Sequence, residues 1–373
     1  MRLFHALAAL CLALFAAAPA HAQPQQTAWD NVQRIVVFGD LHGEYDKFED
    51  MLRTAGLIDT AGHWSGGRTH FVQLGDVPDR APDTRRILDH LMRLEGEARH
   101  AGGYVHALIG NHEAMNMMGD LRYTTPGEFA AFTDRNSARR RDQYYARYVA
   151  ALRAHPPASG LPVFGPDYRA QFDAAHPLGW VEHQTAWAPS GVYGRWVTSH
   201  SAIIRINDTM FMHGGLGSAF ANSDINTLDN AVVAALRGHP DPAFADILEN
   251  QQGPLWYRGL ASNDEATETA NVDALLTHYN VHRIVLGHTK RASTVFPRFN
   301  GRVILADIAV PNGYTDPHAF LIIEGQTLTT VHRGQRVPLN AATPAATCAY
   351  LAQIIAVDTP NSPLVADRAQ CPA

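Results

Sequence analysis

Cysteine is scarce in this chain, with 3 in 373 residues. Cys11 lies in an N-terminal segment that we expect to be removed, and Cys348 and Cys371 lie close to the C-terminus. None of them is near a sequence motif, which argues against a thiol nucleophile. The last two cysteines either form a disulfide that ties down the C-terminal tail, as in exported proteins, or remain unpaired thiols in a frayed tail.

Long hydrophobic runs are also lacking. After residue 22 no segment approaches the roughly 20 apolar residues of a membrane-spanning helix, so we expect no stable membrane span. The first residues combine Arg2, a short apolar stretch over 7–18 and the small-residue pattern Ala20-His21-Ala22. This pattern predicts a secretory signal peptide over 1–22 and a periplasmic or secreted mature protein.

An excess of positive charge is absent, because 30 Lys and Arg face 36 Asp and Glu, for a formal net charge of −6. Non-specific nucleic-acid binding relies on many cationic contacts, so no nucleic-acid partner is expected. The sequence does not indicate the oligomeric state. We predict one elaborated domain over 30–335 and an appended tail over 336–373, since the motifs described below are spread along the chain.

The first half of the predicted domain alternates strands and helices. Apolar runs at 35–38, 71–74 and 105–109 each lead into a glycine, and helical segments follow after residue 44 and from about residue 84. Short buried strands that alternate with helices are typical of parallel β/α units.

The second half predicts further strands at 196–206, 209–213, 283–286, 303–306, 319–323 and 327–331, with a turn at 207–208 and a hairpin at 324–325. Helices are expected around 228–236 and 272–279. Strands in quick succession argue for a second sheet. The predicted fold class is therefore α/β, with two packed mixed β-sheets flanked by helices.

An insertion over the site is predicted at about 114–195. Its first part, 126–154, has helical spacing, whereas 155–189 is rich in Pro, Gly and aromatic residues and is predicted to be a loop. The aromatic residues either form a satellite core or line a substrate pocket; the tyrosines at helical spacing favour the core, and the loop favours the pocket. These residues are Tyr144, Tyr145, Tyr148, Phe164, Tyr168, Phe172, Trp180 and Trp187.

Five short motifs place metal ligands where predicted strands end: GDLHG (39–43), GDVPDR (75–80), GNHE (110–113), HGG (213–215) and GHT (287–289). A single motif of this kind is more often a simple turn. Five in one chain, each after an apolar run, indicate a shared crevice. Other histidines, among them His63, His90, His100, His155, His239 and His332, are interpreted as surface or packing residues, and His200 as a structural residue within a strand.

The motifs supply ligands for two metal ions. We expect Asp40, His42 and Asp76 to hold the first ion, and Asp76 to bridge to a second ion held by Asn111, His213 and His288 as well. Such a pair of ions lowers the pKa of water to give a hydroxide nucleophile. His112, next to Asn111, can act as general acid, with Asp79 orienting its ring.

These motifs resemble the calcineurin-like metallophosphoesterase superfamily, and in particular its phosphoprotein phosphatase branch. The segments GNHEAMNMMGDLRY (110–123) and GPLWYRG (253–259) are similar to the Shewanella-like protein phosphatases. The resemblance implies a four-layer αββα sandwich and carries the same metal-ligand, proton-donor and orienting roles onto the residues above. Departures are Ala81, which replaces a usual glycine, and Pro78, which stiffens the loop.

The resemblance also implies that Arg80 clamps the substrate phosphate together with Asn111. Arg258 is interpreted as a second clamp, with a surface ion pair as the alternative; an arginine fork can bind two phosphate oxygens. The mixed ligand set suits manganese, iron or zinc.

The resulting hypothesis is a secreted phosphomonoesterase acting on phosphotyrosine, phosphoserine or phosphothreonine in proteins. One alternative is a hydrolase of dinucleotide polyphosphates or other small phosphoesters. A more distant alternative is a non-catalytic, metal-stabilised binding module.

Overall fold

The computed structural model describes residues 26–308 and 312–371. The predicted signal peptide, 1–22, lies outside the described residues. Within these two ranges, no helix is both long and apolar enough to cross a membrane.

Two six-stranded sheets form the centre of the molecule. In the first, neighbouring strands are β1 (Ala28–Trp29), β5 (Ile203–Ile206), β6 (Thr209–Met212), β7 (Arg283–Leu286), β9 (Val303–Leu305) and β8 (Phe296–Arg298). In the second they are β12 (Gln335–Pro338), β11 (Thr327–His332), β10 (Phe320–Glu324), β2 (Arg34–Phe38), β3 (His70–Gln73) and β4 (Tyr104–Ala107). Both sheets mix parallel and antiparallel pairs, as predicted.

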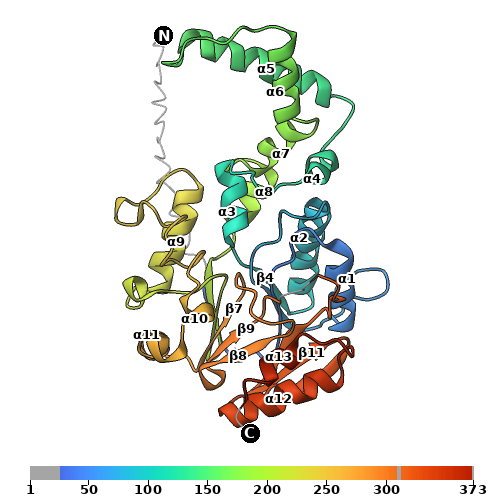
Figure 1. Ribbon diagram of the computed structural model, residues 1–373, viewed down its shortest axis with the longest axis vertical. Helices are drawn as coiled ribbons and strands as arrows, with labels where there is room; N and C mark the ends of the chain where they lie inside the picture. The colour runs from blue at the N-terminus through green and yellow to red at the C-terminus, as the bar shows by residue number, and fades with distance from the viewer. Residues whose placement is uncertain (1–25, 309–311, 372–373) are drawn as a thin grey trace, which may run out of the picture.

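The alternation of side chains along each strand builds the layers. In β2, Ile35 and Val37 join a cluster with Val285 and Ile304 of the other sheet, whereas Val36 and Phe38 pack toward the helices. Successive strand residues point to opposite faces, so both faces of each sheet are buried. Helices cover the outer faces, as Figure 1 shows, and the predicted four-layer arrangement is confirmed.

The helices flanking the second sheet are α1 (Tyr45–Thr54) and α2 (Thr84–His100). Those flanking the first are α9 (Ile225–Leu236), α10 (Gly259–Ser262) and α11 (Glu265–Tyr279). Three short 3₁₀ turns lie at Ser218–Phe220, Pro242–Phe244 and Phe299–Gly301. The hairpin predicted at 324–325 joins β10 and β11.

Between β4 and β5 the chain forms six helices: α3 (Asn111–Met118), α4 (Pro126–Ala131), α5 (Ser137–Ala154), α6 (Pro166–Ala175), α7 (Trp180–Trp187) and α8 (Val192–Val197). The prediction of a loop over 155–189 was wrong, because α6 and α7 occupy much of it. Pro166 stands in the first turn of α6, where its missing N–H costs no hydrogen bond. Pro in that segment therefore marks a helix start.

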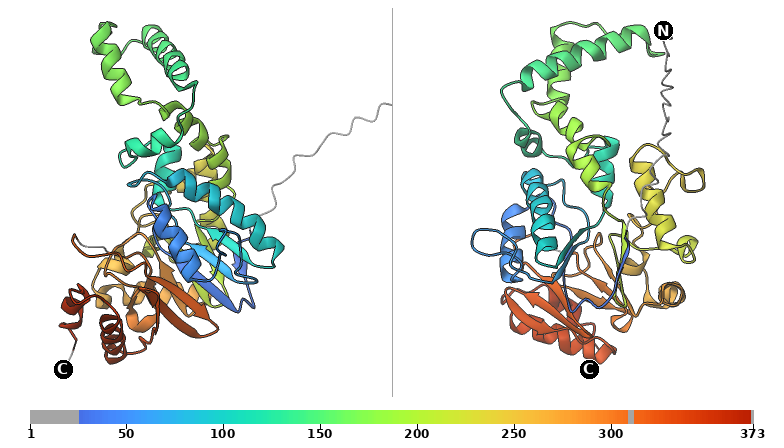
Figure 2. Two further views of the ribbon diagram at one scale, coloured as in Figure 1. Left: turned by 90° about the vertical axis from the view of Figure 1, so that its right-hand side faces the viewer. Right: turned by 180° about the vertical axis from the view of Figure 1, so that it is seen from behind.

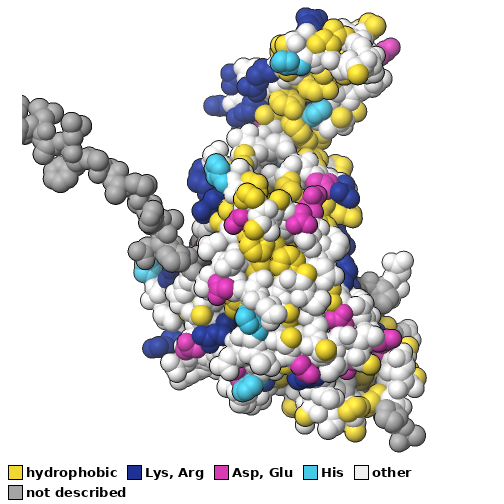
Figure 3. Space-filling view, turned by 90° about the vertical axis from the view of Figure 1, so that its left-hand side faces the viewer, with side chains coloured by type: hydrophobic (Ala, Val, Ile, Leu, Met, Phe, Trp, Pro, Cys, Tyr) yellow, Lys and Arg dark blue, Asp and Glu magenta, His cyan; other side chains and the backbone are white. Residues whose placement is uncertain are grey.

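The insertion has a base and a projecting part. At the base, Phe129, Phe132, His183 and Tyr193 pack ring against ring. The projecting part, α5 and α6, extends away from the sheets in all ribbon views (Figures 1 and 2). Its tyrosines Tyr144, Tyr145 and Tyr148 surround Phe172, which confirms the satellite core expected for them. Figure 3 shows basic and hydrophobic side chains on its surface.

The strand predicted over 196–206 begins later than expected, at Ile203. Trp196 and Val197 belong to α8, and the indole N–H of Trp196 donates to Glu95 of α2 at 2.9 Å. His200 follows this helix and also contacts Glu95, through Nε2 at 2.7 Å. The aromatic, β-branched composition favours a strand locally, but packing against α2 decides for a helix.

The C-terminal residues are packed rather than frayed. A disulfide joins Cys348 and Cys371, and helices α12 (Pro344–Ala356) and α13 (Leu364–Arg368) follow β12. Tyr350 and Ile354 belong to the core cluster between the sheets. Of the two arrangements left open for the cysteines, the disulfide is the one found.

Candidate metal centre

The predicted ligands lie at the carboxyl ends of five strands. Residues 39–43 follow β2, 75–80 follow β3, and Asn111 begins α3 after β4, while His213 follows β6 and His288 follows β7. Because these strand ends meet at one edge of the two sheets, residues far apart in sequence come together. Every predicted metal ligand is found there.

Several site residues adopt left-handed backbone conformations that are uncommon outside glycine. The φ angles are positive at His42 (47°), Asp76 (57°), Asp79 (76°), Arg80 (70°) and His288 (63°). Such conformations cost roughly 1–3 kcal/mol each and persist only where the surroundings enforce them. The strained turns therefore aim side chains into the crevice at the expense of stability.

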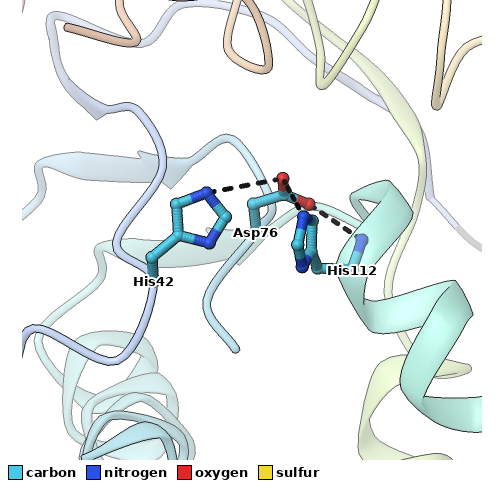
Figure 4. Close-up of side chains that lie close together, drawn as sticks. All are labelled: His42, Asp76 and His112. Carbon is cyan, nitrogen blue, oxygen red and sulfur yellow. Dashed lines mark hydrogen bonds and ion pairs between the residues drawn. The ribbon is translucent and has the colours of Figure 1, made fainter. Parts of the chain in front are cut away.

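Asp76 is the central residue of the site. Its Oδ2 lies 3.9 Å from His42 Nε2 and 3.7 Å from His112 Nε2. Dashed lines mark both contacts in Figure 4. Its Oδ1 lies 3.2 Å from His213 Nε2 and accepts a hydrogen bond from the backbone N–H of His112 at 2.9 Å. The two carboxylate oxygens thus face two different clusters, as a bridging ligand requires.

The first cluster contains Asp40, His42 and Asp76. His42 Nε2 lies 3.6 Å from Asp40 Oδ2 and, although buried, has no hydrogen-bond partner among the described residues. Its other nitrogen, Nδ1, lies 3.0 Å from the carbonyl oxygen of Pro78. A buried ring nitrogen left without a partner is expected of a metal ligand.

The second cluster converges more tightly. His213 Nε2 lies 3.0 Å from Asn111 Oδ1 and 3.0 Å from His288 Nδ1, in addition to Asp76. The far nitrogens face backbone carbonyls: His213 Nδ1 lies 2.9 Å from Leu74 O, and His288 Nε2 lies 3.3 Å from Trp256 O. If those nitrogens carry the protons, His213 Nε2 and His288 Nδ1 keep free lone pairs close to the oxygens of Asn111 and Asp76, and the ligand atoms of Asp76, His213 and His288 all lie within 4.8 Å of one another. Ligand atoms about 2 Å from a common cation lie about 3 Å apart, so these residues fit a metal ion.

The electrostatics also favour a cation. Burial opposes ionisation of Asp76, but His213 and His112 outweigh it and hold the Asp76 pKa well below its usual range. Burial likewise opposes protonation of His213, and Asp76 overcomes it and raises the pKa to about 9. The position between Asp76 and His213 therefore favours positive charge, which either a proton or a metal ion can supply.

His112 and Asp79 form a buried pair. His112 Nδ1 lies 2.5 Å from Asp79 Oδ2, and Asp79 also accepts hydrogen bonds from Asn116 and from Thr124 Oγ1, the latter at 2.9 Å. Burial opposes the charged imidazole, but Asp76 and Asp79 outweigh it and raise the pKa of His112. The pair can hold a proton at Nε2, toward Asp76.

Glu113 organises the loops behind the ligands and was not assigned from the sequence. Its carboxylate accepts hydrogen bonds from the backbone N–H groups of Asp76 (2.9 Å), Val77 (2.8 Å) and Gly110 (2.8 Å). Burial, with the nearby Asp76, raises its pKa to about 7. Its place in the GNHE motif was the available signal.

Asp307 is a second buried acid that sequence reasoning missed. It follows β9, faces Asp40, and its Oδ2 has no hydrogen-bond partner among the residues described. Burial and the Asp40 carboxylate raise its pKa well above the usual range. The signal was an acid directly after the apolar run 303–306, which resembles the pattern that identified Asp40 and Asp76 but lacks their intervening glycine.

The two arginines differ in position. Arg80 is exposed and lines a cavity of about 340 Å³ together with Asp40, His42, Asp307 and Lys290. Arg258 lies beside the second cluster, where its guanidinium donates to the carbonyl of His288 at 2.7 Å and to Thr289 Oγ1 at 3.1 Å. Arg258 is exposed but makes no surface ion pair within the described ranges, so the alternative considered for it is not found.

Comparisons with known proteins identify a family and several relatives. The family described as calcineurin-like phosphoesterase matches residues 33–292. Shewanella-like protein phosphatase 2 of Arabidopsis thaliana is 29% identical over 299 residues, covering 78% of this chain and 75% of that protein. Shewanella-like protein phosphatase 1 of Plasmodium berghei is 24% identical, covering 83% of this chain and 72% of that protein.

A solved structure is also similar. The cold-active protein-tyrosine phosphatase of a psychrophilic Shewanella species superimposes with a TM-score of 0.64 at 26% sequence identity. The match covers 85% of this chain and 83% of that protein. The likeness therefore includes most of the sandwich.

Proposed function

Because this chain belongs to the calcineurin-like phosphoesterase family and is a metal-dependent phosphoester hydrolase, we propose that it is a phosphomonoesterase acting on phosphorylated proteins. Its substrates are phosphotyrosine, phosphoserine or phosphothreonine side chains. The pairing of His112 with Asp79 beside Asp76 is the observation that carries the proposal. Similarity to proteins named as protein phosphatases supports the choice of substrate class.

The proposed function requires two metal ions. Asp40, His42 and Asp76 would hold one ion, because Asp40 and Asp76 both lie within 4 Å of His42 Nε2. Asp76, Asn111, His213 and His288 would hold the other. When bound, such ions neutralise phosphate charge and lower the pKa of water. Carboxylate, amide and imidazole ligands suit manganese, iron or zinc.

Substrate phosphate is bound by arginine and by Asn111. Arg80 reaches the cavity from an exposed position with no acidic partner among the described residues, which leaves its fork available for two phosphate oxygens. Arg258 approaches from the side of His288 and contributes a second positive charge. Asn111 has two roles, because it binds the substrate phosphate and also serves as a metal ligand.

His112 supplies the proton that the leaving group needs. A water molecule adds to phosphorus and releases one proton to solvent, the bond from phosphorus to the leaving oxygen breaks, and that oxygen takes the proton from His112 Nε2. His112 then regains a proton from solvent. Asp79 keeps Nε2 turned toward the reacting atoms, since it binds the opposite nitrogen at 2.5 Å. The raised pKa of His112, which Asp76 and Asp79 cause against burial, keeps the proton available.

The protein functions outside the cytoplasm, in the periplasm or after secretion. The leader-like residues 1–22 support this proposal. The disulfide between Cys348 and Cys371 supports it too, because such bonds persist mainly in oxidising compartments. Detection of the mature N-terminus in a periplasmic or culture fraction would test it.

The decisive experiment compares substrate classes on metal-analysed protein. We expect phosphate release from phosphopeptides to exceed hydrolysis of diadenosine tetraphosphate, and metal content to approach two ions per chain. The Asp76→Asn variant is the inactive control. Preferred cleavage of the dinucleotide would favour a small-molecule hydrolase, and metal-loaded protein without any turnover would favour the binding module.

A further inference from the structure

Tyr123 is an exposed aromatic residue beside the proton donor. It lies between α3 and α4 and is 44% exposed, whereas His112 and Asp79 are buried. Its ring centroid lies 5.0 Å from that of His112, with an interplanar angle of 38°. One face of the tyrosine thus contacts the imidazole, and much of the rest of the ring is open to solvent.

The backbone of Tyr123 is fixed to the catalytic loop. Its carbonyl accepts a hydrogen bond from the backbone N–H of Arg80 at 3.1 Å. The next residue, Thr124, donates to Asp79 Oδ1 at 2.9 Å. Glu128, in the capping box of α4, accepts from the backbone N–H of Asp79 at 3.0 Å. Tyr123 therefore keeps its place relative to both Arg80 and Asp79.

Neither a hydrogen bond nor core packing within the described residues accounts for the position of the Tyr123 side chain. Its hydroxyl makes no hydrogen bond to any residue in the described ranges 26–308 and 312–371. It does not belong to either core cluster within those ranges. The Arg80 guanidinium lies 5.6 Å from the ring centroid, so the ring neighbours both the phosphate-binding arginine and the proton donor.

We propose that Tyr123 is a specificity-determining residue that stacks on an aromatic leaving group. This inference rests on the proposed function. The leaving oxygen must come within about 3 Å of His112 Nε2 to take its proton. The group attached to that oxygen then lies next to the exposed part of the Tyr123 ring.

The geometry distinguishes aryl from alkyl phosphates. Aromatic rings attract one another with centroids about 4.5–7 Å apart, a range that a phosphotyrosine ring can reach from His112. The single methylene of phosphoserine offers little surface for such a contact. Tyr123 should therefore raise the preference for phosphotyrosine by about three- to tenfold.

The test measures kcat/KM for Tyr123→Ala and Tyr123→Phe on two matched substrate pairs. One pair is a peptide carrying either phosphotyrosine or phosphoserine at the same position, and the other is phenyl phosphate and ethyl phosphate. Tyr148→Ala is the matched control, because Tyr148 is 37% exposed but lies on the projecting helix α5. Variant-to-parent ratios remove the intrinsic difference between the leaving groups.

We expect Tyr123→Ala to lower kcat/KM on the aryl substrates by about three- to tenfold and to leave the alkyl substrates nearly unchanged. Tyr123→Phe and Tyr148→Ala should resemble the parent. If Tyr123 had only a structural role, the loss of kcat/KM would be larger on the alkyl substrates than on the aryl substrates. If the ring only positioned His112, alkyl substrates would lose more, because their poorer leaving group depends more on the acid.

Equal losses on both substrate classes, or a larger loss on the alkyl esters, would overturn the proposal. Failure of the proposed function looks different: the parent would hydrolyse phenyl phosphate but neither phosphopeptide. In that case the small-ester pair still decides whether Tyr123 recognises aryl groups.

Discussion

Asp76 in the metal centre and Phe172 in the insertion are both buried, at 2% and 5% exposed, but for different reasons. Asp76 is surrounded by His42, His112 and His213 and accepts a hydrogen bond from one backbone N–H, in a turn with a positive φ angle. Phe172 is surrounded by Tyr144, Tyr145, Tyr148 and His176, on a regular helix.

The two residues depend on their surroundings in different ways. Polar groups in the site need specific partners, since a buried charge without a partner costs several kcal/mol. The aromatic cluster depends mainly on apolar area, which tolerates change more easily. We therefore expect chemistry to depend on the strand ends and to be nearly independent of the projecting helices.

The largest effect is expected for Asp76→Asn. The change removes charge from both clusters and should reduce turnover of p-nitrophenyl phosphate by about 10⁴-fold, with loss of bound metal. Turnover and metal content are measured together. Asp142→Asn is the control, because Asp142 lies exposed on α5. Full activity of the Asp76 variant would refute the two-metal site.

His112→Asn should have the next largest effect. Without a proton donor, kcat on an alkyl phosphate should fall by roughly 10³-fold, with metal content nearly intact. On p-nitrophenyl phosphate the deficit should be smaller, because that leaving group departs as a stable anion. His155→Asn, at an exposed position after α5, provides the control. Equal losses on both esters would contradict the acid role.

A pH effect on stability is expected at the base of the insertion. Burial between Phe129 and Phe132 lowers the pKa of His183 from 6.5 to about 4. Because the unfolded chain binds this proton more readily, His183 contributes stability above pH 6.5 that is lost as the pH falls toward 4. Between pH 7 and pH 5 the loss should be about 2 kcal/mol.

Urea unfolding at both pH values checks this expectation. The free energy of unfolding of His183→Leu should depend less on pH than that of the parent, by about 2 kcal/mol over this range. The exposed His239 gives the matched control in His239→Leu. An unchanged pH dependence in the His183 variant would mean that another group titrates there.

The smallest effect is expected from removing the projecting helices. Replacing 141–176 with a flexible Gly-Ser linker of about ten residues keeps Ser137 and Arg140, which contact Glu182 of α7 at 2.7 and 2.6 Å. Turnover of p-nitrophenyl phosphate and metal content should stay within about twofold of the parent. A large loss of bound metal would show that the projecting helices α5 and α6 stabilise the metal centre.

Peptide turnover on the same variant sharpens the comparison. The sequence predicted that the loop 155–189 walls the substrate pocket, yet α6 within it projects away from the sheets (Figure 2). If Tyr123 determines the choice between peptides, the preference of the shortened variant should match that of the parent. A changed preference would show that the projecting helices α5 and α6 contribute to the choice between peptides.

The residues predicted to bind metal could be picked out from the sequence because each of them stands at or shortly after the end of a short apolar run. Asp40, Asp76 and Asn111 follow short apolar runs that end in glycine, and a buried parallel strand delivers the next polar residue to one edge of the sheet. Their chemistry is a property of the side chains themselves. Short continuous apolar runs likewise indicated buried strands, and the strands in quick succession in the second half indicated a second sheet.

Only the tertiary structure decided the rest, because those features depend on contacts between distant residues. Trp196 is helical through its contact with Glu95 of α2, against its local preference. Glu113 gains its role from the backbone of a neighbouring loop, and Asp307 from its approach to Asp40. The position of Tyr123 beside His112 follows from the turn between α3 and α4, whose path no periodicity in the sequence encodes.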